Sequence, residues 1–200
     1  MVSDAYKFLI PLLSLGVIFC LAHLYPIAVL FFILAAFVGY FFRNPKRSIP
    51  DGKNLIVSPA DGKVVRILQG TSGEQIISIF LNIFNVHVTR SPIEGELTNL
   101  EYKRGKFKAA YYDEASRVNE QNVITISNQG KEVVVRQIAG LIARRVICWK
   151  KPGDRLARGE VIGLIRFGSR VDVIMPENTV IKVKIGDNVK GGSTILGDYR

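Results

Sequence analysis

Hydrophobic residues dominate the N-terminal part of the chain. Between residues 8 and 42 there is no Asp, Glu, Lys or Arg, and this run of about 35 residues exceeds the roughly 20 that one membrane-crossing helix needs. At residues 23–26 (HLYP) a polar ring, an interfacial aromatic side chain and a proline suited to a helix's first turn follow one another. The pattern predicts two short helices, at about 8–24 and 26–42, joined by a tight turn.

Basic residues flank this apolar run on both sides. Lys7 precedes it, and Arg43, Lys46 and Arg47 follow it. The positive-inside tendency therefore places both ends on the cytoplasmic side of the cell membrane, and residues 1–45 are predicted to form a membrane anchor. A cleaved signal peptide is too short to explain two apolar blocks, whereas a buried core hairpin and a re-entrant hairpin that does not fully cross stay open.

The remainder, residues 46–200, has a different texture. Short β-branched runs are cut by Gly, Asp and Pro, without a helical period. A mainly β domain of the barrel or sandwich kind is expected, with a polar, aromatic loop at 103–121 as a lid or membrane-facing segment. The predicted strands lie at 54–58, 62–68, 75–81, 86–89, 95–102, 123–127, 132–137, 145–149, 161–166, 171–175 and 180–185.

Near the C-terminus the chain almost repeats itself. Residues 153–163 (GDRLARGEVIG) and 186–197 (GDNVKGGSTILG) each place a Gly-Asp turn before a strand. Such a repeat predicts a pseudo-symmetric β unit. The turns are similar to those of biotinyl and lipoyl domains, in which flattened hairpins pack face to face, and this similarity concerns the fold alone.

Charge and cysteine content indicate which kinds of binding partner and cofactor the chain can have. The 27 Lys and Arg against 17 Asp and Glu leave a net charge of +10, which suits an anionic partner. With a membrane anchor present, an anionic membrane is favoured over nucleic acid. The two cysteines, Cys20 and Cys148, build no disulfide framework, and neither has a neighbouring histidine or C-x-x-C pattern that would predict a metal site.

Three polar positions have ordinary structural explanations when each is taken alone. Gly168-Ser169 is typical of a turn or bulge, Asp61 of an Asx turn, and His87 of a hydrogen-bonded residue in a strand. His23 falls in the predicted membrane turn, so His87 is the soluble part's one histidine. It is the candidate general base or acid.

Together these positions belong to a set of motifs that resembles the phosphatidylserine decarboxylase family, in its short form found in archaea and many bacteria. The resemblance covers nearly the whole chain, beginning with the apolar hairpin. Its motifs are FRNP at 42–45, SPADGKV at 58–64, NVHVTRSP at 85–92, NEQN at 119–122 and FGSRVD at 167–172.

The resemblance implies a proenzyme that cuts itself between Gly168 and Ser169. Ser169 would attack the carbonyl of Gly168, which is open because glycine has no Cβ, and end as a covalent pyruvoyl group that forms a Schiff base with phosphatidylserine. His87 would act as base or acid and Asp61 would orient it. Fragments 1–168 and 169–200 are expected to stay associated, with phosphatidylethanolamine and CO₂ as products.

Two departures from the longer bacterial enzymes concern arginines. Those enzymes have two histidines three residues apart, and here Arg90 follows His87 instead, so the base that activates Ser169 stays open. They also have a small polar residue after the cleaved serine, where this chain has Arg170. Arg170 and Arg90 are therefore candidate ligands for a carboxylate or phosphate oxygen of the substrate. For Arg170 a solvated position on a strand stays open as the alternative.

Three other functions explain less of the sequence. A biotinyl or lipoyl carrier presents a lysine between the repeats, where this chain has Gly168-Ser169-Arg170. A sugar-transport phosphocarrier needs paired histidines, and a basic membrane adaptor leaves the ordered motifs unexplained. The sequence leaves open whether the chain forms a homo-oligomer, whether the lipid is a diacyl or ether lipid, and whether cations between Lys103 and Arg117 bind the head group.

Overall fold

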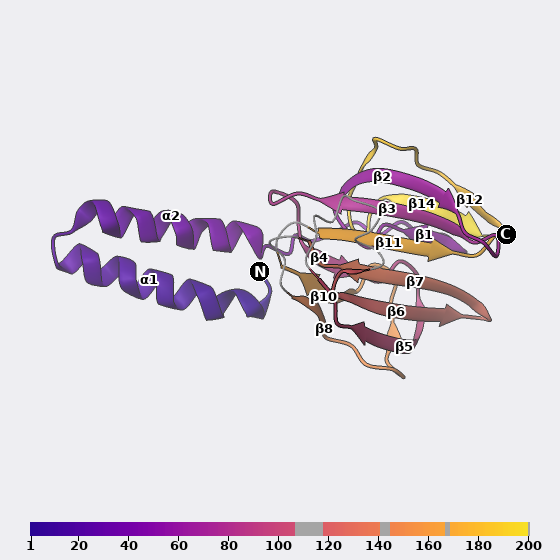
Figure 1. Ribbon diagram of the computed structural model, residues 1–200, viewed down its shortest axis with the longest axis horizontal. Helices are drawn as coiled ribbons and strands as arrows, with labels where there is room; N and C mark the ends of the chain where they lie inside the picture. Colours follow the sequence, from indigo (N-terminus) through magenta and orange to yellow (C-terminus); the bar gives the residue numbers. More distant parts are fainter. Residues whose placement is uncertain (107–117, 141–144, 167–168, 200) are drawn as a thin grey trace. The chain divides into compact units, whose positions relative to one another are not determined.

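The computed structural model describes residues 1–106, 118–140, 145–166 and 169–199. The chain divides into two compact units, Met1–Lys46 and Arg47–Arg200. The first holds a short 3₁₀ helix and two α-helices, and the second is built of strands (Figure 1). The predicted mainly β fold with an N-terminal helical hairpin is confirmed.

The helical unit consists of η1 (Ser3–Ala5), α1 (Tyr6–Leu21) and α2 (Tyr25–Phe41). The turn between the helices begins earlier than predicted because His23 adopts φ 60°, which ends α1 at Leu21. Within the described residues, Ser3–Leu21 is long and apolar enough to cross a membrane, and Tyr25–Phe41 is a shorter apolar helix. An apolar span of this kind indicates membrane association.

Close contact between the two helices depends on a small residue. Gly16 is buried in α1, and a Cβ at this position would lie 2.8 Å from Cε1 of Phe32 on α2. Phe19 and Phe31 stack with ring centroids 5.4 Å apart. The hairpin is therefore packed by aromatic side chains against a glycine, which is the small-residue contact that apolar helices favour.

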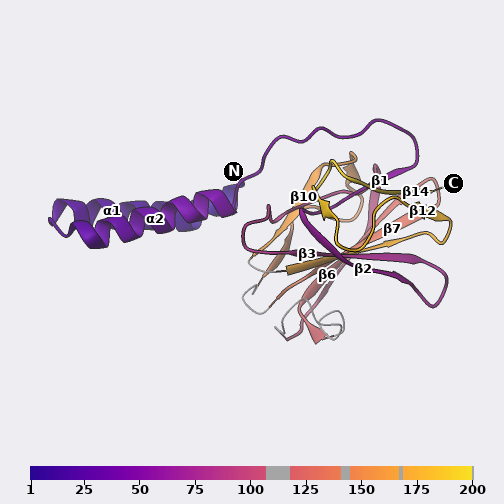
Figure 2. The same ribbon diagram turned by 90° about the horizontal axis from the view of Figure 1, so that it is seen from above.

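Three sheets make up the second unit. An eight-stranded sheet in the order β13-β2-β3-β11-β7-β6-β5-β9 curls into a half-barrel, and two three-stranded sheets, β1-β14-β12 and β4-β10-β8, lie on one side of it (Figure 2). The strands are β1 (Leu55–Val57), β2 (Gly62–Gln69), β3 (Gln75–Leu81), β4 (Val88–Arg90), β5 (Gly95–Lys103), β6 (Gln121–Asn128), β7 (Lys131–Ile138), β8 (Val146–Cys148), β9 (Arg155–Leu156), β10 (Val161–Ile165), β11 (Ser169–Met175), β12 (Thr179–Ile181), β13 (Asn188–Val189) and β14 (Ile195–Tyr199).

The core lies between these sheets and follows the two-residue period of the strands. On β3, β7 and β11 alternate residues are buried against one another because successive side chains point to opposite faces. The fully buried core residues on these three strands include Ile77, Ile79, Leu81, Val133, Val135, Val171 and Val173.

The strand order shows that the domain consists of two similar halves, a repeat larger than the two Gly-Asp segments that the sequence indicated. The half β13-β2-β3-β11 of the large sheet corresponds to β9-β5-β6-β7, and β1-β14-β12 corresponds to β4-β10-β8. In chain order, one complete seven-stranded half, β4 to β10, is inserted between β3 and β11 of the other. The segment from β10 to β11, which contains Gly168-Ser169, is therefore the return from the inserted half to the outer half.

The two Gly-Asp turns mark equivalent places in these halves. Gly153 and Gly186 have φ of 92° and 99°, a region that glycine adopts without strain. The carboxylate Oδ2 of Asp154 accepts a hydrogen bond from the Lys151 N–H at 3.0 Å, and that of Asp187 accepts one from the Lys184 N–H at 2.9 Å. The same local structure thus precedes β9 and β10 in one half and β13 and β14 in the other.

Candidate active site

Ser169 is the first residue of β11 and lies at one end of the large sheet. It pairs in register with Leu81, the last residue of β3. Its side chain lies on the same face as Val171 and Val173 because strand residues alternate, and it is fully buried. The serine is thus held in the apolar interior beside the end of the neighbouring strand.

The Ser169 hydroxyl is buried and has no hydrogen-bond partner among the residues that the structure describes. Leaving a buried hydroxyl in this state costs about 1–3 kcal/mol. Such groups are uncommon in folded proteins, and a catalytic role is one explanation for them. Gly168, the other half of the predicted cleavage site, lies outside the described residues.

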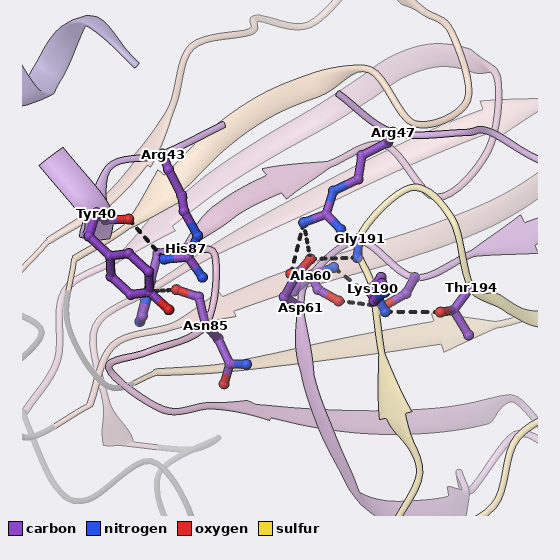
Figure 3. A network of polar contacts seen from close by, with 11 residues as sticks. Tyr40, Arg43, Arg47, Ala60, Asp61, Asn85, His87, Lys190, Gly191 and Thr194 are labelled. Carbon is purple, nitrogen blue, oxygen red and sulfur yellow. Dashed lines mark hydrogen bonds and ion pairs between the residues drawn. The ribbon is translucent and has the colours of Figure 1, made fainter. Parts of the chain in front are cut away.

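His87 is held next to the strand that leads to Ser169. Its backbone carbonyl accepts a hydrogen bond of 3.1 Å from the N–H of Ile165, the last residue of β10. The imidazole is fully buried, and its Nδ1 lies 3.0 Å from the carbonyl oxygen of Asn85 (Figure 3). A carbonyl only accepts, so Nδ1 donates, and the neutral ring then carries its lone pair on Nε2.

Asp61 lies in a polar cluster with Arg47 and Gly191, separate from the contact between His87 and Asn85. Both of its carboxylate oxygens accept from Nη2 of Arg47 at 2.8 Å, and Oδ1 also accepts from the backbone N–H of Gly191 at 2.8 Å (Figure 3). In the described part of the chain these contacts, rather than His87, hold Asp61. The Nδ1 position where an orienting carboxylate would bind is taken by Asn85, so the orienting role of Asp61 stays a prediction.

Arg90 joins the Asp61 cluster. Its Nη1 donates to the carbonyl of Gly159 at 2.9 Å, and its backbone N–H donates to the carbonyl of Pro59 at 2.8 Å. Burial, together with the neighbouring positive charge of Arg47, lowers the pKa of Arg90, and the carboxylate of Asp61 partly offsets this. The structure therefore brings Arg90 together with Asp61, while His87 is held beside the strand leading to Ser169.

Arg170 follows Ser169 on β11, with its side chain on the opposite face of the strand. The guanidinium is 1% exposed and forms an ion pair with Asp172, with Nε 2.9 Å from Oδ1 and Nη2 3.1 Å from Oδ2. The contact of Nη2 with Oδ2 is a hydrogen bond, and the charge of the guanidinium is balanced by the carboxylate of Asp172. A substrate carboxylate or phosphate would have to share or displace Asp172, and this role of Arg170 stays a prediction.

A buried polar network that the sequence did not single out connects the sheets near His87. Gln137 on β7 is fully buried, and its Nε2 donates to Oγ1 of Thr89 at 2.9 Å and to the carbonyl of Ile147 at 3.3 Å. Its Oε1 accepts from Nδ2 of Asn122 at 2.9 Å. Gly163 leaves room for it, since a Cβ there would lie 2.9 Å from Gln137 Nε2. One signal was available: Gln137 occupies an inward position after Val133 and Val135.

Replacing Gln137 with leucine is expected to destabilise the β domain. The change leaves the buried amide of Asn122 and the hydroxyl of Thr89 without this partner, at a cost of about 2–3 kcal/mol. Thermal unfolding in detergent should show a clearly lower midpoint. Gln69→Leu makes the same chemical change at an exposed position on β2 and should leave the midpoint nearly unchanged; equal midpoints for both variants would contradict the prediction.

Other chemistry has little support in the described residues. Within 1–106, 118–140, 145–166 and 169–199, no group of three or more His, Cys, Asp or Glu is placed to hold a metal ion. Burial raises the pKa of the Cys148 thiol, which disfavours the reactive thiolate. Lys103, Arg104 and Lys106 from the predicted head-group loop are exposed, and residues 107–117 of that loop lie outside the described part.

Comparison with known proteins gives one consistent result. The family model described as phosphatidylserine decarboxylase matches residues 34–197. The chain is 48% identical over 180 residues to the phosphatidylserine decarboxylase proenzyme of Syntrophus aciditrophicus, covering 86% of this chain and 84% of that one. With the protein of the same name from Carboxydothermus hydrogenoformans it shares 43% identity over 195 residues, or 93% and 92% of the two chains.

These matches define the protein class as a decarboxylase. The chain belongs to the phosphatidylserine decarboxylase family. The resemblance stated from the motifs is confirmed, and the carrier-domain, phosphocarrier and adaptor alternatives are set aside.

Proposed function

We propose that this chain converts phosphatidylserine to phosphatidylethanolamine and CO₂ after cutting itself between Gly168 and Ser169. The observation that carries the proposal is the buried Ser169 hydroxyl, which lacks a hydrogen-bond partner among the described residues and lies at the start of β11. Family membership and the proenzyme names of the relatives support it.

Self-cleavage requires Ser169 to attack the preceding carbonyl. Its Oγ forms a bond to the carbonyl carbon of Gly168 and gives up its proton to a base, the C–N bond breaks, and the nitrogen is protonated. Removal of the Ser169 α-proton then expels the Gly168 carboxylate and leaves a dehydroalanine. Its amino group tautomerises to an imine, which water hydrolyses with loss of ammonia, so a pyruvoyl group ends the small fragment.

His87 is the proposed base. The Asn85 carbonyl fixes Nδ1 as the protonated nitrogen, which leaves Nε2 to accept a proton. The bond from Ile165 N to His87 O holds the residue beside the strand that leads to the cleavage site. The apolar surroundings limit access of water, so the proton passes between side chains rather than to solvent.

The environment of Ser169 fits a pyruvoyl group. A small planar carbonyl can occupy the volume of the serine side chain beside Leu81 and Val171, both fully buried. When present, the group supplies an electron-withdrawing carbonyl that takes up the charge left by loss of CO₂. Arg170 would be the adjacent cation, Arg90 would bind the polar head group, and Asp61 would orient His87.

The proposed enzyme consists of a membrane anchor and a catalytic domain. Residues 1–45 form the anchor in the cell membrane, with both ends and the catalytic domain, 46–200, on the cytoplasmic side. After the cut, residues 1–168 and 169–200 stay together because β11 pairs with both β3 and β7. The partner is phosphatidylserine in an anionic membrane.

Intact mass of the full chain purified in detergent tests the proposal. Two fragments are expected, 1–168 with a new carboxylate and 169–200 with a pyruvoyl group. The small fragment should resist sequential N-terminal degradation, since it has no free amine, until the carbonyl is converted to one by reductive amination. A folded wild-type chain that stays whole and unmodified in lipid would refute self-processing.

A further inference from the structure

We propose that the loop of residues 82–87 inserts Ile83 and Phe84 into an anionic bilayer, so that the catalytic domain itself docks on the membrane beside its active site. The inference rests on the proposed function in one respect: the substrate lipid comes from the bilayer on which the domain docks.

The tip of this loop presents apolar side chains to solvent. Ile83 is 37% and Phe84 62% exposed, although the strand before them contributes buried residues to the core. Exposed aromatic and aliphatic side chains at a loop tip gain free energy when a bilayer covers them. Aromatic residues are also favoured at the membrane interface.

The loop is held in a defined turn. The N–H of Phe84 donates to Oδ1 of Asn82 at 2.9 Å, and the N–H of Asn82 donates to Oδ1 of Asn85 at 2.9 Å. The N–H of Asn85 donates to the carbonyl of Asn82 at 3.0 Å. Because these bonds already fix the backbone, docking costs little conformational entropy.

The loop lies at the active site. It starts after Leu81, the register partner of Ser169, and ends at His87, whose carbonyl accepts from Ile165. The loop thus connects β3, which pairs with β11 at Ser169, to β4, which pairs with β10, the strand that precedes Ser169. A bilayer contacted by Ile83 and Phe84 would therefore lie near the strand ends that carry Ser169 and His87, where the proposed reaction needs the lipid head group.

Charge on the same end of the domain suits an anionic bilayer. The antiparallel registers place the start of β2, the end of β5 and the start of β8 at the same end of the domain as the 82–87 loop. Positive residues close to anionic lipid strengthen the binding of an apolar tip. The exposed cations at these strand ends are Lys63, Lys103, Arg104, Lys106 and Arg145.

A single-tryptophan probe in the full chain tests the contact. Trp149 is the chain's one tryptophan, so the background is Trp149→Phe and the probe is Phe84→Trp. The matched control is Leu68→Trp, because Leu68 is 51% exposed at the opposite end of the β2–β3 hairpin. Both proteins are reconstituted in vesicles of phosphatidylcholine and phosphatidylserine, with or without lipids brominated along the acyl chains.

The proposal expects brominated lipid to quench the residue 84 probe strongly and to shift its emission to shorter wavelength, while the residue 68 probe is little affected. Replacing phosphatidylserine by phosphatidylcholine should weaken the quenching at residue 84. Equal quenching at both positions, or none at residue 84, overturns the proposal. This readout needs neither cleavage nor turnover, so it stands even where the proposed function fails.

An activity measurement separates docking from a general defect. Phe84→Asp should still cleave itself and should turn over a short-chain phosphatidylserine dissolved as monomers at the wild-type rate. Its turnover of vesicle phosphatidylserine should fall about tenfold or more, since burial of one Phe is lost. Leu68→Asp should match wild type on both substrates. Equal losses of Phe84→Asp on both substrates would contradict docking through this loop.

Discussion

Ser169→Ala is expected to leave the chain whole and without decarboxylase activity. The variant lacks the only atom that can attack Gly168 in the proposed scheme, and it also lacks the atoms from which the pyruvoyl group is made. Because alanine fits the buried position beside Leu81, the fold should be retained. Intact mass measures cleavage, and release of labelled CO₂ from carboxyl-labelled phosphatidylserine measures activity.

Two variants sharpen this test. Ser169→Thr keeps the hydroxyl and should cleave more slowly, because its added methyl group has to fit a fully buried site. Ser193→Ala makes the same serine-to-alanine change within the small fragment at a partly exposed position and should process normally. Cleavage of Ser169→Ala at the same bond would show that another group performs the attack.

His87→Ala is expected to slow self-cleavage by about 10²- to 10⁴-fold, the usual contribution of a positioned general base. The rate is measured by following the uncut chain after synthesis in a cell-free system with nanodiscs. Added imidazole should restore part of the rate, because the truncation leaves space beside Asn85 and Ile165, which contact His87. A purely structural role would not produce this rescue.

His23→Ala provides the control, since His23 is the chain's other histidine and lies in the turn between α1 and α2. It should cleave at the wild-type rate. If His87→Ala also cleaves at that rate, the base is elsewhere, and the polar cluster around Asp61 becomes the place to look.

Much of the architecture was predictable because it depends on local pattern. Absence of charge over residues 8–42 and the proline at position 26 predicted the helical hairpin, and β-branched runs predicted most of the strands. Strands β9 and β13 were missing from the predicted set because two residues carry no period. Strand β14 was also missing, although it follows the second Gly-Asp turn as the repeat implied.

The partners of individual side chains were harder to predict. Asp61 was predicted to orient His87, which stays a prediction, and the sequence did not reveal that its carboxylate accepts from Arg47 and Gly191, which are 14 and 130 residues away along the chain. Arg170 was predicted as a candidate substrate ligand, which stays a prediction, and the sequence did not reveal its ion pair with Asp172. Such pairings are decided by which strands meet in three dimensions, and a single sequence contains no direct signal for them.

The insertion of one half into the other explains why the fold can be retained after the proposed cut in the backbone. The proposed cut falls between β10 and β11, where the chain returns from one half to the other, and each of these two strands has its own partners: β10 pairs with β4 and β8, and β11 pairs with β3 and β7. The 169–200 piece supplies β11 to β14, and each of these strands pairs with the rest of the domain or with another of the four. If the proposed cut occurs, the two fragments are expected to stay joined as one folded domain, because the strand pairings of β11, β13 and β14 cross from one fragment to the other.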